Sequence, residues 1–160
     1  MKSLLDIRNT AQYWQEVVQP NAIEYGRTRT PRAAFNLAVS LWHIHEWVVV
    51  QKNPNADKKL LKEQRKEYEA FVLSECPELG ILHDLATAHK HAVVSRSLGK
   101  IASSESEITS VHFSFFGQQP VSEHGSDMRI TLDDGSIKNL DEIFGVALNY
   151  WNHVLPEHLR

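Results

Sequence analysis

The sequence predicts a mainly α-helical fold, a bundle of about five helices with a small antiparallel β insertion of a hairpin or three strands before the last helix. Apolar residues recur at helical spacing up to about residue 98, and further along the chain they alternate with polar residues. Asp133-Asp134-Gly135-Ser136 has the composition of a tight hairpin turn. The 160 residues contain no repeat and no long linker, so we expect a single domain, 1–160.

Periodicity and helix-end residues define the helices one by one. Ser3 and Asp6 form a capping pattern at the start of the first helix, and Pro20 is expected to stop it, leaving a connection before the next helix. Thr30 is the predicted cap of the second helix, whose two apolar faces are typical of the middle of a bundle. Asp141 is the predicted cap of the last helix. The predicted helices are 3–19, 31–51, 56–74, 77–98 and 141–155.

The alternating segments predict a small sheet. The expected strands are 109–116, 128–133 and 136–139, with a polar loop between the first two. So small a sheet is marginal alone, and we expect it to pack on the helices.

Composition limits the function classes. The chain is 42% hydrophobic and 23% charged with a net charge of −3, which excludes disorder as the main state and gives no reason to expect nucleic-acid binding. The basic residues of 58–66 are interleaved with glutamates, as on a solvated helix face. A single cysteine, Cys76, excludes an internal disulfide. The first residues do not form a signal peptide and no apolar run is long enough to span a membrane, so we expect a cytoplasmic protein without a membrane partner.

Several ionisable residues fall on apolar helix faces. Glu46 lies within the apolar stripe of the second helix, with His43 on its edge. His89 and Arg96 share one line near the centre of the apolar face of the fourth helix. Buried charges need partners, so we expect Glu46 to be buried and paired with His89, or second with Arg96. Such a network either fixes how the helices pack or lines a small polar pocket.

A second line on the fourth helix contains Asp84 and His91, which lie two turns or roughly 10 Å apart, too far for a direct hydrogen bond. His83 and Lys90 are expected on the opposite, solvated side.

A metal site has little support in the sequence. His43 and His45 diverge on a helix, and His43 with Glu46 would need His89 or Asp84 as a third ligand. We therefore expect neither a metal nor another cofactor.

Three short segments resemble a group of small uncharacterised bacterial proteins. They are the Trp-rich 41–48, Cys76-Pro77 at a helix start, and 83–91, which contains an Asp-Leu-Ala-x-x-x-Lys-His stretch. A short hairpin and a Trp-bearing last helix follow in that group, and the resemblance covers about 35–155. It implies a bacterial protein with this fold and gives no indication of its activity. It adds Asp84, Lys90 and His91 to the candidate residues, and Thr87 stands where the group has Asn.

Two function classes remain open. Without a strong catalytic signature, the sequence favours a non-catalytic helical bundle that binds a partner or a small ligand. The alternative is a small hydrolase or nuclease in which His89 or His91 is the acid/base and Glu46 or Asp84 orients it.

Self-association is the expected partner interaction. The last helix is apolar over more than half of its circumference, including Val146, Tyr150 and Trp151. An apolar surface that one small domain leaves uncovered predicts a homodimer or higher oligomer.

Overall fold

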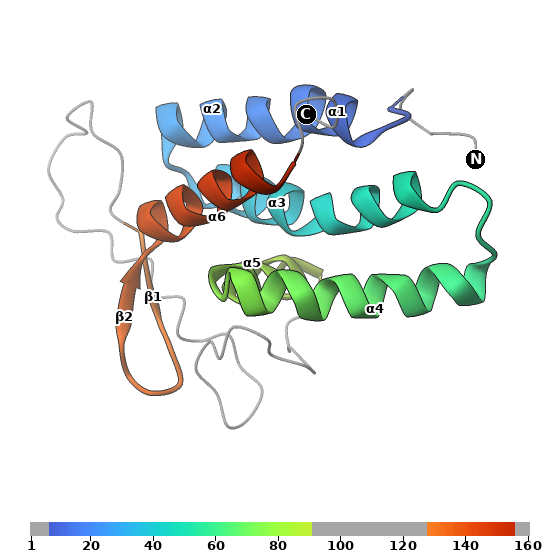
Figure 1. The fold of residues 1–160 in the computed structure, drawn as a ribbon. Helices are drawn as coiled ribbons and strands as arrows, with labels where there is room; N and C mark the ends of the chain where they lie inside the picture. Colours follow the sequence, from blue (N-terminus) through green and yellow to red (C-terminus); the bar gives the residue numbers. More distant parts are fainter. Residues whose placement is uncertain (1–6, 91–127, 156–160) are drawn as a thin grey trace, which may run out of the picture.

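The computed structural model describes residues 7–90 and 128–155, and for 88–90 it describes only the backbone. It shows a helical bundle with a two-stranded antiparallel hairpin before the last helix, which confirms the predicted fold class (Figure 1). The elements are α1 (Thr10–Tyr13), η1 (Trp14–Val18), α2 (Gln19–Thr28), α3 (Pro31–Lys52), α4 (Lys58–Glu75), α5 (Glu78–Lys90), β1 (Arg129–Thr131), β2 (Ile137–Asn139) and α6 (Leu140–Val154).

The first helix runs through Pro20, so the predicted stop there is wrong. α1, η1 and α2 follow one another without a break, and Asn9 caps the start by accepting a hydrogen bond from the Gln12 N–H. The π-helical turn η1 precedes Pro20, which therefore lies in the first turn of α2, where a missing N–H costs little. The expected long connection shrinks to Arg29 and Thr30. The predicted cap at Ser3 lies outside the described residues.

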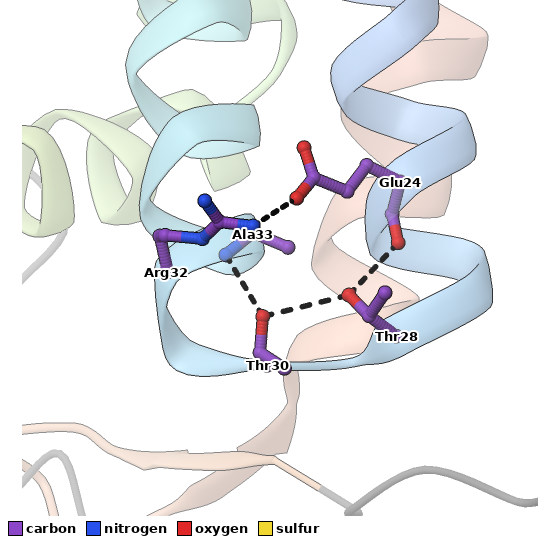
Figure 2. Close-up of polar contacts among 5 residues, drawn as sticks. All are labelled: Glu24, Thr28, Thr30, Arg32 and Ala33. Carbon is purple, nitrogen blue, oxygen red and sulfur yellow. Dashed lines mark hydrogen bonds and ion pairs between the residues drawn. The ribbon is translucent and has the colours of Figure 1, made fainter.

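Hydrogen bonds hold the sharp corner between α2 and α3 (Figure 2). Thr30 caps α3 as predicted, because its hydroxyl accepts from the Ala33 N–H at 3.3 Å. The Thr28 hydroxyl donates to the Glu24 carbonyl at 2.9 Å. The Arg32 guanidinium lies 2.6 Å from the Glu24 carboxylate and ties the two helices together. The corner therefore turns α3 back along α2.

α3 is the central helix of the bundle, as its two apolar faces predict. It lies between the N-terminal helix and the α4–α5 pair (Figure 1), and it also contacts α6. Its buried residues are Ala33, Ala34, Leu37, Ala38, Ser40, Leu41, Trp42, Ile44, His45, Val48 and Val49. This helix therefore carries side chains into the interfaces with both neighbours.

The hairpin packs on the helices through one apolar side. β1 and β2 pair antiparallel, with Ile130 opposite Lys138, and Gly135 has a φ of 80° in the predicted turn. Ile130 is fully buried. Asn139 caps α6 by accepting from the Asp141 N–H at 2.8 Å, so the prediction that Asp141 is the cap is wrong. The cap moves because β2 runs directly into α6, which begins one residue earlier. The predicted strand 109–116 lies outside the described residues.

Among the described helices, none has a stretch long and apolar enough to cross a membrane.

Candidate functional site

Polar side chains gather where α3 packs against α5. Asp84 of α5 and His45 of α3 are almost completely buried, at 2% and 3% exposure. The Trp42 indole lies between their two helices, with its ring 4.9 Å from the ring of His83 and 4.5 Å from that of His45. Such groups are costly to bury without partners, so their hydrogen bonds define what the site can do.

Asp84, His83 and Thr87 form a continuous chain of hydrogen bonds along α5. The Asp84 carboxylate lies 2.9 Å from His83 Nδ1, and His83 Nε2 lies 3.3 Å from the Thr87 hydroxyl. An ionised carboxylate only accepts, so Nδ1 carries the proton in this arrangement. In the neutral ring, Nε2 then accepts from the hydroxyl. The three groups therefore follow the order carboxylate, imidazole base, hydroxyl, in which the base can accept the proton of the hydroxyl.

The expectation that His83 points to solvent is wrong. Its side chain is only 17% exposed, because the Trp42 ring from α3 packs against it. The helical wheel gives the angle of His83 on α5, but not the neighbouring helix that covers that angle.

His45 is a buried neutral histidine. Its Nδ1–H donates to the Trp42 carbonyl, and its ring packs on the Trp42 indole. Burial lowers the pKa of His45, and it outweighs the raising effects of the Trp42 carbonyl and of the Glu46 and Glu69 carboxylates. The ring is thus uncharged at neutral pH.

The prediction that Glu46 is buried is wrong. Its side chain is 38% exposed, and its carboxylate lies 3.6 Å from the Arg65 guanidinium of α4. The reason is that α4 packs along α3 and places a charged side chain, Arg65, beside Glu46. His43, on the edge of the same stripe, is partly buried and its Nδ1 contacts the Val39 carbonyl at 2.7 Å.

The remaining predicted site residues are outside what the structure describes. This holds for the side chains of His89 and Lys90 and for all of His91 and Arg96. Pairing of Glu46 with His89 or Arg96 therefore stays a prediction. Within the described residues, no group of three or more His, Cys, Asp or Glu side chains is arranged to hold a metal ion.

Sequence reasoning included Asp84 but missed His83, Thr87 and His45. A signal for the first two was present, because residues four apart on a helix are neighbours, which brings His83 to Thr87. Helix spacing brings Trp42 to His45 within α3, but no signal placed Trp42 against His83, since that contact joins two helices.

A second feature is an apolar surface on α4 and α6. It consists of Tyr68 and Phe71 of α4 with Val146 and Tyr150 of α6, and we call it the α4–α6 face. Phe71 is 50% and Val146 is 47% exposed. Tyr68 stacks on Phe71 with ring centroids 5.9 Å apart. Burial is the largest cause of the raised pKa of Tyr150, and the Tyr68 phenol adds to it.

Trp151 does not belong to this surface, contrary to expectation. It is fully buried, because its side of α6 faces the core.

No family model matches the sequence, and no curated protein or solved structure is significantly similar to it. Both features are therefore interpreted from their own geometry.

Proposed function

We propose that this protein is a helical interaction module that associates with a second copy of itself through the α4–α6 face. The observation that carries the proposal is the half exposure of two large apolar side chains, Phe71 on α4 and Val146 on α6. Tyr68 and Tyr150 extend this pair inward, and both rings pack against the hydrophobic core. Large apolar side chains with aromatic neighbours are typical of the centre of an interface.

The charge pattern around the face favours a second copy as the partner. α4 carries both basic and acidic residues, such as Lys62, Arg65 and Lys66 beside Glu63 and Glu67. In a dimer with a two-fold axis, α4 of one copy can lie beside α4 of the other. Because α4 carries both basic and acidic residues, the basic residues of one copy can then pair with the acidic residues of the other. Burying the exposed half of each large apolar side chain is worth about 1 kcal/mol, and each contributes twice in a dimer.

The position of Glu46 weakens the alternative of a small-ligand pocket. The predicted pocket required Glu46 to face inward, but its carboxylate is at the surface beside Arg65. Asp84 is buried and bonded to His83. These two observations favour binding of a protein partner at the surface over binding of a small ligand in a cavity. The bacterial cytoplasm is the proposed setting, and a single buried thiol, Cys76, suits that reducing compartment.

Sedimentation velocity over a wide range of protein concentration tests the proposal. We expect the wild type to form a dimer as concentration rises, and Phe71→Asp and Val146→Asp to stay monomeric. Ile23→Asp is the matched control, since Ile23 is 62% exposed but lies on α2, and it should dimerise like the wild type. Circular dichroism confirms that each variant is folded. A wild type that is monomeric even at about millimolar concentration, or variants that associate as strongly as the control, would overturn the proposal.

A further inference from the structure

We propose that Thr87 is a nucleophilic hydroxyl, activated by His83 and Asp84, that accepts an acyl group from a small activated ester. This inference is independent of self-association, because it concerns α5 where it packs on α3 and not the α4–α6 face. It rests on the order, spacing and burial of three side chains on one helix.

The hydrogen bonds have the order that a hydroxyl nucleophile needs. The carboxylate of Asp84 lies 2.9 Å from Nδ1 of His83, which holds the proton on that nitrogen. The opposite nitrogen, Nε2, is left with its lone pair directed to the Thr87 hydroxyl at 3.3 Å. A base that faces a hydroxyl and is oriented by a third group is the arrangement that activates serine and threonine nucleophiles.

The carboxylate end of this chain of hydrogen bonds is buried, whereas His83 and Thr87 are partly exposed. Asp84 is 2% exposed, His83 is 17% exposed, and Thr87 is partly exposed. A buried carboxylate strengthens its interaction with the imidazolium that forms during reaction, because nearby water is excluded. A partly exposed hydroxyl can meet a small reagent from solvent.

The three groups are held in position before any substrate arrives. Residues 83, 84 and 87 lie within little more than one turn of α5, so helix geometry fixes their spacing. The Trp42 ring meets the His83 ring edge-on at 4.9 Å and an angle of 70°, which restricts rotation of the imidazole. Prior orientation of this kind lowers the entropic cost of reaction.

The chemical step transfers one proton and one acyl group. The Thr87 oxygen attacks the ester carbonyl carbon and forms a new C–O bond, while its proton passes to His83 Nε2. Asp84 stabilises the resulting imidazolium. The bond to the leaving alkoxide or phenoxide then breaks, and that oxygen takes the proton from Nε2. Water removes the acyl group in the reverse manner, with His83 again as the base.

Acetylation by p-nitrophenyl acetate tests this inference, with peptide mass mapping of the modified residue and release of p-nitrophenol as readouts. We expect one acetyl group on Thr87 of the full chain. Thr87→Val should remove that modification, and His83→Gln should slow it by about 10²- to 10⁴-fold. Thr28→Val is the matched control, since the Thr28 hydroxyl contacts the Glu24 carbonyl and the Thr30 hydroxyl rather than a histidine, and acetylation of Thr87 should persist.

A second measurement does not depend on variants that fold. Nitrogen NMR of the histidine rings in the wild type should show His83 as the Nδ1–H tautomer. Folded wild type that is not acetylated at Thr87, an equal rate in folded His83→Gln, or an Nε2–H tautomer of His83 would each overturn the proposal.

Discussion

Burial of His45 should make the protein lose stability in mild acid. The ring is 3% exposed, and burial lowers its pKa below the ordinary value of 6.5. Glu46 and Glu69 oppose this shift and His43 adds to it, but burial is the largest cause. The unfolded chain therefore binds a proton at a higher pH than the folded chain does, and the free energy of unfolding must fall as pH falls below about 6.5.

The size of the effect follows from one proton. Between the unfolded pKa and the lower folded pKa of His45, the loss is about 1 kcal/mol per pH unit. Above about pH 7.5, where the ring is almost fully uncharged in both states, His45 contributes little pH dependence.

Urea unfolding of wild type and His45→Gln, at several values between about pH 5 and pH 8, measures this loss. The variant should be less stable at neutral pH, because packing on Trp42 is lost, but its stability should fall less steeply in acid. His153→Gln is the control: His153 also contacts a helix carbonyl, that of Asn149 at 2.8 Å, but is exposed. It should follow the wild-type slope. Equal slopes for wild type and His45→Gln would refute the reasoning.

Three further predictions concern other parts of the fold and are tested by chemical unfolding. Arg29 has a φ of 43°, so Arg29→Gly should be about 1 kcal/mol more stable than Arg29→Ala, both having lost the same side chain; equal stability would show that the backbone is not strained. Glu46→Gln should lower the free energy of unfolding by less than about 1 kcal/mol, because the pair with Arg65 is partly exposed. A loss of about 3 kcal/mol would instead support the sequence-based prediction that Glu46 is buried and paired. Leu82→Ala should cost about 2–5 kcal/mol because Leu82 is fully buried, whereas Leu60→Ala, at a position 43% exposed, should cost less than about 1 kcal/mol; similar costs would contradict this account of the core.

Local rules predicted most of the elements correctly and failed at the first helix. Thr30 and Gly135 act as cap and turn residue because their effects need only neighbouring residues. Pro20 was expected to end a helix because it lacks an N–H, but the π-helical turn before it places it where that N–H is not needed. The rule for proline assumes a regular α-helix, and the sequence carries no clear sign of the π-turn.

In the candidate site, too, helical periodicity predicted some side-chain positions correctly and others wrongly. Periodicity placed Asp84 near a buried face, and it is buried. Periodicity also placed Glu46 inward and His83 outward, and both are wrong. A helical wheel gives the angle of a side chain about its own axis, but its exposure depends on which helix lies opposite.

The sequence by itself determined the fold class, the central place of α3 and the hairpin before α6, because these depend on apolar periods and turn residues that act within a few positions. Only the tertiary structure decided the chemistry. It placed Trp42 between His45 and His83, moved Glu46 to Arg65 on α4, and buried Asp84 beside His83. The physical reason is that burial and pairing energies depend on groups a few ångströms away in space, and the groups that cover His83 and pair with Glu46, Trp42 and Arg65, are on another helix.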